Sequence, residues 1–253
     1  MTSVAGPIPR RERARAATVD EIKATALELM HEQGTTDVRF TDIARVMGMT
    51  PPALYRYFAD RDELLVALIT DAYNDLGDAV AAARDAVDEE DIRGRWIAAA
   101  GAYRQWALRE PQQFSLIFGL PVPGFVAPQE GPTTEAASRA LSQLAAMFAD
   151  ASRRGRLDPP LVRTVPDSLR DCVAEEQKFS DIAPESFQAM LHAWASLHGI
   201  TSLEAYGHLD WMDPEARDAL FLGQVRLAAQ TAGLPADRDA AATEVDPAAV
   251  PGT

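Results

Sequence analysis

Apolar residues recur at helical spacing, three or four positions apart, in one segment of the chain after another. No segment shows the sustained alternation of apolar and polar residues that is typical of a half-buried strand, and glycine–asparagine hairpin turns are missing. The pattern therefore predicts an all-α protein. We expect helices over about 18–33, 40–47, 51–58, 60–85, 91–109, 111–118, 133–153, 166–178, 184–206 and 214–231, and a loop rich in proline and glycine over 119–132.

Short polar residues mark the start of several of these helices. Thr18, Thr50 and Asp60 are expected to cap the helices that follow them, because a side-chain oxygen at this position accepts a hydrogen bond from one of the first free amides. Asp213, followed by Pro214, marks the start of the last helix in the same way.

Two short helices joined by a turn at Gly48, with a longer helix in front of them, predict a helix-turn-helix. A helix of this kind fits the major groove of DNA, where residues near its N-terminus reach base edges. The side chains expected to face inward and fix the angle between the two helices are Ile43, Val46, Met49, Leu54 and Phe58. Those left on or near the outer face of the second helix are Thr50, Pro51, Pro52, Ala53, Tyr55, Arg56 and Tyr57.

The stretch FTDIARVMGMTPPALYRYFADRDELLVALI resembles the DNA-binding domain of TetR-family transcriptional regulators. The resemblance covers about residues 16–76, with the helix-turn-helix motif at about 39–58. It implies a homeodomain-like three-helix head and an α-helical body that dimerises and usually binds a small-molecule effector. The matching motifs are Ile43–Ala44, Gly48–Met49–Thr50, Leu54–Tyr55–Arg56–Tyr57–Phe58, Arg61 and Asp62–Glu63–Leu64.

The resemblance also implies which residues meet DNA. Tyr55 and Tyr57 match positions that hold backbone phosphate contacts, although a packing role is the alternative for Tyr55. Arg61 matches the basic residue at the start of the fourth helix, and Thr41 is a further candidate for phosphate contact. Hydroxyl and guanidinium groups are phosphate donors, so the chemistry agrees. The positions that meet bases and phosphates are matched by Thr50, Pro51, Pro52 and Ala53.

The sequence departs from the family pattern at several positions. Arg39 stands where the family prefers a serine or threonine cap, and Phe40 stands where a phosphate-contacting threonine is common. Pro51 and Pro52 lack backbone amides and offer no polar group to read bases. Base recognition is therefore expected to depend on Arg56 and on apolar contact with thymine methyl groups.

The charge is unevenly distributed. Acidic residues outnumber basic ones by 38 to 24, but residues 1–60 hold eight of each, so the remainder carries the whole net charge of −14. An acidic body repels nucleic acid, and any DNA contact must come from the N-terminal quarter. We expect residues 1–15 to be a flexible basic arm that either reaches DNA or stays in solvent; its arginines are Arg10, Arg11, Arg13 and Arg15.

A second resemblance covers the C-terminal half. The stretches PVPGFVAP and AWASLHGITSLEAYGHL resemble a C-terminal subfamily of TetR regulators with a Trp…His-Gly signature, here Trp194, His198 and Gly199. We expect residues 77–234 to form the helical effector-binding and dimerisation domain. Residues 235–253 are expected to be a disordered tail, because they are rich in alanine, aspartate and proline and show no periodicity.

The sequence predicts neither catalysis nor a metal or other cofactor. The four histidines lack metal-ligand spacing, Cys172 is the only cysteine, and nucleophile-elbow, phosphate-loop and dinucleotide motifs are absent. No apolar run approaches the ~18 residues that a membrane helix needs. A secretory signal has an apolar core after its basic residues, and the N-terminal stretch lacks such a core after its arginines. We therefore expect a cytoplasmic protein without membrane contact.

Aromatic residues of the body exceed what a simple helix-bundle core requires. Packing is the default role of each one, but together with the resemblance they predict a cavity for a small apolar or aromatic ligand. Loop 119–132 would then be an entrance or lid. The candidate ligand contacts are Trp96, Tyr103, Trp106, Phe114, Phe118 and Phe148.

The last two predicted helices carry a signal for association. The helix over 214–231 is apolar on several sides, and Gly199 and Gly223 lie mid-helix, where each costs about 1 kcal/mol relative to alanine. Close helix–helix approach would explain these glycines. We expect 184–206 and 214–231 to form a four-helix homodimer interface; a close contact within one chain is the alternative.

These observations predict a dimeric, sequence-specific DNA-binding transcriptional regulator on a pseudo-palindromic double-stranded operator. It would be a repressor released by its ligand, with the helix over 60–85 as the lever. The alternative is a helical protein that binds or sequesters small molecules and whose helix-turn-helix no longer binds DNA. The acidic body and the few basic residues around Pro51–Pro52 keep that alternative open.

Overall fold

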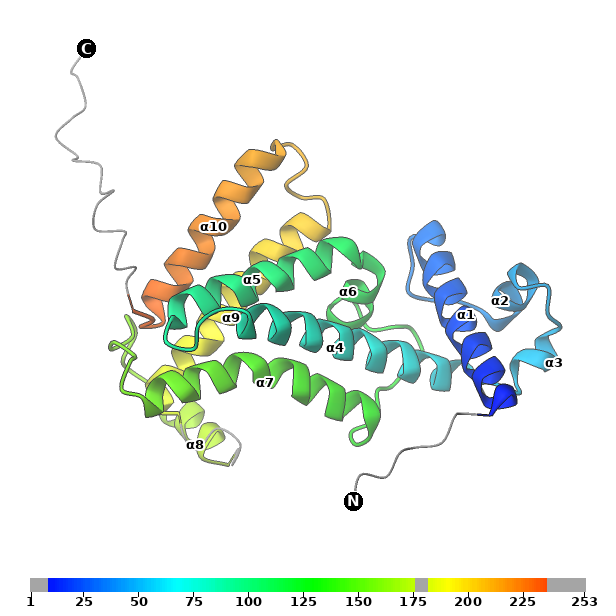
Figure 1. Cartoon of the computed structure of the whole chain (residues 1–253), viewed down its shortest axis with the longest axis horizontal. Helices are drawn as coiled ribbons and strands as arrows, with labels where there is room; N and C mark the ends of the chain where they lie inside the picture. The colour runs from blue at the N-terminus through cyan, green and yellow to red at the C-terminus, as the bar shows by residue number, and fades with distance from the viewer. Residues whose placement is uncertain (1–8, 176–181, 236–253) are drawn as a thin grey trace, which may run out of the picture. The chain divides into compact units, whose positions relative to one another are not determined.

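The computed structural model describes residues 9–175 and 182–235. Within these ranges all regular secondary structure is helical, which confirms the predicted all-α class (Figure 1). The helices are α1 (Arg10–Gln33), α2 (Phe40–Val46), α3 (Pro51–Leu54), α4 (Arg61–Asp85), α5 (Ile92–Arg109), α6 (Pro111–Phe118), α7 (Pro132–Arg153), α8 (Asp167–Glu175), α9 (Pro184–Ala205) and α10 (Pro214–Thr231).

From α4 onward the predicted boundaries agree with the structure to within one residue wherever the residues are described. The capping predictions explain part of this agreement. The Asp60 carboxylate accepts a hydrogen bond from the Glu63 amide at 2.8 Å, and Asp213 accepts one from the Ala216 amide at 2.8 Å. Each of these carboxylates satisfies a backbone donor that the helix itself cannot pair.

The start of α1 was predicted wrongly. The helix begins at Arg10, eight residues before Thr18, so the expected flexible arm is helical over residues 10–15. The added turns consist mostly of arginine and alanine, which are strong helix formers. Thr18 does not cap, because it lies inside the helix and its hydroxyl donates to the Ala14 carbonyl at 3.0 Å. Residues 1–8 of the expected arm, and all but the first residue of the expected 235–253 tail, lie outside the described residues.

The chain divides into two compact units. The first, here called the head, comprises Met1–Asp75 and Arg109–Arg139; the second, the body, comprises Leu76–Leu108 and Ala140–Thr253. The expected division placed 109–139 with the body. These residues join the head because Leu116 and Val122 are buried in its core.

The head core fixes the first four helices. Ile22 and Met30 of α1, Ile43 of α2, Leu54 of α3 and Leu64 of α4 are almost wholly buried in one cluster. Burying each such side chain stabilises the fold by roughly 1.5–3 kcal/mol. An ion pair of 2.7 Å between Lys23 and Asp71 adds a polar tie between α1 and α4.

Ties from α5 to α9 and α10 stabilise the body. The Arg104 guanidinium of α5 forms two hydrogen bonds of 2.6 Å with the carboxylate of Glu204, whose side chain is only 5% exposed. The same guanidinium pairs with Asp218 of α10 at 2.7 Å and lies 4.7 Å from the centre of the Phe221 ring. The Trp96 indole donates to the Val225 carbonyl at 2.9 Å. One arginine and one tryptophan therefore hold α10 against α5.

Candidate DNA-binding surface and ligand cavity

The predicted turn at Gly48 is present in the head. Gly48 has φ +64°, a conformation that favours glycine, and the next amide, of Met49, donates to the Ala44 carbonyl at 2.8 Å. The side chains of Leu54 and Phe58, on the inner side of the segment that begins with α3, are buried as predicted. Val46 was expected to face inward as well, but its side chain is 57% exposed because it lies on the outer side of α2.

The segment from α3 to the start of α4 presents the predicted DNA contacts. Its helix is one turn long, and residues 55–57 continue as a turn rather than as helix to Phe58. Thr41, at the start of α2, is also exposed. Of the other candidates, Thr50, Pro51, Pro52, Tyr55 and Arg56 are exposed, while Ala53, Tyr57 and Arg61 are partly buried.

Thr50 does not cap α3 with its side chain. Pro51 and Pro52 occupy the first two helical positions and have no N–H, and the Ala53 amide donates to the Thr50 carbonyl at 2.8 Å. The Thr50 hydroxyl therefore has no free amide to cap, because Pro52 has no N–H and the Ala53 N–H already donates to the Thr50 carbonyl. The exposed Thr50 hydroxyl can serve an external acceptor or donor instead.

Tyr55 combines packing with exposure. Its ring lies 5.2 Å from that of Phe40, which is buried in the head core, yet 55% of the residue is exposed. The Phe40 ring supports the inner edge of the phenol and leaves the outer part accessible. The two roles considered for Tyr55 are therefore compatible.

Arg15 ties the start of α1 to the segment after α3. Its guanidinium donates to the Arg56 carbonyl at 2.8 Å and lies 5.1 Å from the centre of the Tyr57 ring. Figure 1 shows this end of α1, in dark blue, beside α3. The added turns of α1 carry three further exposed arginines: Arg10, Arg11 and Arg13.

Arg61 is directed toward the loop between α1 and α2. Its guanidinium forms an ion pair of 2.7 Å with Asp37 and donates to the Val38 carbonyl at 3.3 Å. This residue therefore positions the loop before α2.

The body contains an apolar cavity of about 60 Å³, bounded by α4, α5, α7 and α9. Of the six predicted ligand contacts, Trp96 and Tyr103 line it. The remaining lining residues are Leu76, Val80, Arg84, Ala99, Ala100, Ala140, Leu141, Gln143, Leu144, Met147, Trp194 and Leu197.

The other four predicted contacts lie elsewhere. Trp106 and Phe148 are fully buried in the body and do not line this cavity. Phe114 and Phe118 belong to the head, where their rings are 5.3 Å apart and that of Phe118 is 6.1 Å from that of Tyr73. The expected lid also belongs to the head, because Val122 is buried in the head core, and residues 119–131 contribute nothing to the lining.

Polar contacts lie beside the cavity. The Tyr103 hydroxyl is hydrogen-bonded to His198 Nδ1 at 2.7 Å, and the imidazole stacks on Trp194 with ring centres 5.4 Å apart. Burial lowers the pKa of His198 from its ordinary value of 6.5, so the neutral imidazole is favoured. His198 of the sequence signature therefore contacts two residues that line the cavity. It stacks on the Trp194 indole and is hydrogen-bonded to the Tyr103 hydroxyl.

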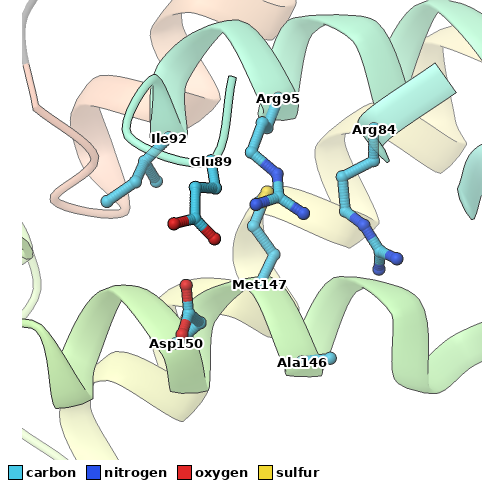
Figure 2. Close-up of a pocket in the computed structure, with 7 residues that line it drawn as sticks. All are labelled: Arg84, Glu89, Ile92, Arg95, Ala146, Met147 and Asp150. Carbon is cyan, nitrogen blue, oxygen red and sulfur yellow. The ribbon is translucent and has the colours of Figure 1, made fainter. Parts of the chain in front are cut away.

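A second, polar pocket of about 180 Å³ adjoins the first, because Arg84 and Met147 line both. Figure 2 shows the Arg84 and Arg95 side chains extending toward the helix that carries Ala146 and Met147. The remaining lining residues are Glu89, Ile92 and Asp150.

Two further features are absent from residues 9–175 and 182–235. None of the helices there combines the length and the apolar character needed to cross a membrane. No group of three or more metal-ligating side chains comes together in the same part of the chain.

The exposed helix α3, held by α2 and the turn at Gly48, defines a helix-turn-helix protein of the DNA-binding class. Comparison with known proteins specifies the family. The model for "bacterial regulatory proteins, tetR family" matches residues 22–68, and the model for "tetracyclin repressor-like, C-terminal domain" matches residues 96–228. The chain therefore belongs to the TetR family of DNA-binding transcriptional regulators.

Individual relatives agree with this assignment. The chain is 34% identical over 203 residues to the HTH-type transcriptional regulator Rv1816 of Mycobacterium tuberculosis, an alignment that covers 74% of this chain and 82% of the relative. The crystal structure of the regulatory protein SCO4313 superposes with a TM-score of 0.68 at 35% identity, covering 87% of this chain and 98% of that one. A tetR-family protein from Rhodococcus RHA1, 18% identical, shares the fold with a TM-score of 0.52, covering 86% and 98% of the two chains.

The sequence did not single out Arg84 or Arg95 as site residues, and it placed Arg15 in a flexible basic arm without predicting its contact with Arg56. Arg84 meets Gln143, 59 positions away, and Arg15 meets Arg56, 41 positions away. Contacts between residues so far apart in the chain do not produce a recognisable spacing in the sequence. Trp194 did carry a signal, the Trp…His-Gly signature, but that signature does not say that the indole lines a cavity.

Proposed function

We propose that the protein is a homodimeric repressor that binds a pseudo-palindromic operator and leaves it when a small, largely apolar ligand occupies the body cavity. The observation that carries the proposal is the exposure of Thr50, Tyr55 and Arg56 on a segment that a buried core holds in place. Hydroxyls and a guanidinium on one exposed segment fit phosphate contact and base readout.

Exposed faces of α9 and α10 support the dimer. Gly199 and Gly223 face open space: a Cβ built on either would meet nothing within 4 Å. This excludes a close contact within the described chain as the reason for these glycines. Apolar and small residues surround them at helical spacing, which suits close packing against a second copy. On α9 they are Leu191, Ala195 and Leu203, and on α10 Ala219, Leu220 and Leu227.

The cavity supports ligand control. Its walls are mostly apolar, so burial would supply most of the affinity. At about 60 Å³ it has room for a few water molecules, and we propose that it widens to accept a ring. Helix α4 supplies Leu76 and Val80 to the cavity and Leu64 to the head core. We propose α4 as the lever, because a ligand shifts DNA binding only if it favours one of two arrangements of the protein.

Footprinting and binding to operator DNA test the proposal. We expect two symmetric half-sites separated by roughly one helical turn, ~34 Å, protected together. Tyr57→Phe should weaken binding to all sequences alike, because phosphate contacts carry no base information, whereas Arg56→Ala should change the preferred sequence. A single half-site protected at saturation, or a protein that binds no DNA flanking its own gene, would contradict the proposal.

Gly223→Arg tests the dimer. The monomer has space for the side chain, so folding should be kept, while sedimentation should show monomers and operator affinity should fall. Gly101→Arg is the matched control, because Gly101 is also a helical glycine with nothing within 4 Å but lies on α5. Equal loss of dimer in both variants would count against the proposed interface.

A further inference from the structure

The polar pocket beside the cavity contains two guanidinium groups that share one carboxylate. Asp85 accepts from Arg84 Nε at 2.8 Å and from Arg95 Nη2 at 3.0 Å. Hydrogen bonding from Arg84, supported by the charge of Arg95, lowers the pKa of Asp85, so this group is ionised. The three side chains together carry a net charge of +1.

Arg95 has unused hydrogen-bonding capacity. Its Nε is buried, and no described residue accepts a hydrogen bond from it. A buried donor without a partner is costly, and a polar ligand group commonly resolves such a case. Arg84, in contrast, is already held, since its Nη1 donates to Gln143 Oε1 at 2.8 Å.

The acidic groups that line the same pocket have partners of their own. Glu89 and Asp150 both pair with Arg154, at 3.2 and 3.0 Å, and Asp150 also pairs with Arg153 at 3.4 Å. Arg154 also pairs with Glu90 at 2.8 Å, so groups other than Arg84 and Arg95 compensate the charge of Glu89 and Asp150 only in part. These two carboxylates would repel a dianion such as a phosphate monoester, so a monoanion fits better.

We propose that the ligand of the body is an amphipathic carboxylate. Its apolar part lies in the cavity beside Trp96, Tyr103 and Trp194, and its carboxylate binds Arg95 in the adjoining pocket. Arg84 and Met147 line both spaces, so one molecule can extend from the first to the second. Carboxylate and guanidinium form charge-assisted, often bidentate hydrogen bonds. This inference rests on the proposed function, because it names the ligand class of the same cavity.

Calorimetric titration of the full chain tests the ligand side without any mutation. The probes are phenylacetate, 3-phenylpropionate and 4-phenylbutyrate, their primary amides, and phenethylamine. We expect at least one carboxylate to bind about tenfold or more tightly than its amide, since only the carboxylate gains the charge-assisted contact. Amides that bind as well as the acids, a preference for the amine, or a series that does not bind at all would overturn the inference.

Substitution tests the protein side. Arg95→Met keeps an unbranched apolar stem and removes the guanidinium, and it should abolish the preference for acid over amide while leaving amide binding unchanged. Arg93→Met is the matched control two positions away, because Arg93 does not line the pocket and donates to the Pro235 carbonyl at 3.2 Å. A preference that survives in Arg95→Met, or that both variants lose equally, would overturn the assignment to Arg95.

Operator binding measured on the same samples separates the two proposals. Carboxylate binding by a protein that ignores DNA would leave the ligand inference intact and remove the proposed repressor function. A protein that binds the operator but does not bind the carboxylates more tightly than their amides would keep the DNA-binding part of the proposed function and remove the ligand inference.

Discussion

Five exposed arginines of the head differ from Arg104 of the body in whether they have an acidic partner. In the head, Arg10, Arg11, Arg13, Arg39 and Arg56 are exposed, and none of them forms a salt bridge with a described acidic residue. In the body, arginines pair with carboxylates, as Arg104 does with Glu204. The same residue type therefore serves as a potential phosphate donor at these five positions and as a structural tie elsewhere, in the head (Arg61 with Asp37) as well as in the body. Composition alone does not separate these uses, because residues 1–60, which contain all five of these arginines, hold as many acidic as basic residues.

The largest effect should come from breaking the most buried tie of the body. Arg104→Met leaves the Glu204 carboxylate buried without its partner, and we expect the free energy of unfolding to fall by about 3 kcal/mol. Denaturant unfolding followed by circular dichroism measures this loss. The control is Arg217→Met, because its partner Asp210 is exposed and such a pair contributes about 1 kcal/mol at most. Equal losses in the two variants would show that burial of the carboxylate is not what matters.

Two residues that the sequence predicts as caps, one that caps and one that does not, give a smaller effect and contrast the two units. Asp213→Ala removes the hydrogen bond to the Ala216 amide and should destabilise the body by about 1 kcal/mol. Thr50→Ala should leave the unfolding free energy unchanged, because its hydroxyl does not cap α3, but it should weaken operator binding. Thermal unfolding and gel shift on both variants test this. A Thr50→Ala protein that unfolds as easily as Asp213→Ala would show that the threonine is structural.

The smallest effect concerns pH. Burial lowers the pKa of His198 in the folded state, so below pH 6.5 the unfolded chain takes up a proton at this residue that the folded one resists. The contribution of His198 to stability is complete above pH 6.5 and is lost as the pH falls toward the lower folded-state value. His198→Gln should flatten the dependence of unfolding free energy on pH in that window. The prediction fails if the slope is the same in both proteins; His208→Gln, in an exposed turn, is the control.

Sequence reasoning was most successful where the deciding contacts are local. Gly48, Asp60 and Asp213 act through neighbours within a few positions, and the structure confirms all three. Thr18 failed because favourable helix formers precede it, and Thr50 failed because two prolines remove the amides it would have served. Both failures have a local cause that a closer accounting of amides and propensities could have found.

The body was harder because a periodic aromatic pattern identifies a helix face and not what covers it. Trp96, Tyr103 and Trp106 lie at helical spacing on α5, yet only the first two line the cavity. Which face meets a cavity depends on α4, α7 and α9, whose residues are distant in sequence. The polar pocket was missed for the same reason.

The two prolines at the start of the recognition helix have an energetic consequence for association. Because a pyrrolidine ring fixes φ near the helical value, Pro51 and Pro52 can adopt few backbone conformations in the unfolded chain. The single turn of α3 is thus set before DNA arrives, and little conformational freedom remains to be lost in the complex. Glycine or alanine in their place would permit a local coil-to-helix transition on binding, with a larger unfavourable entropy and a slower encounter. This short helix therefore owes its rigidity to its covalent structure more than to its length.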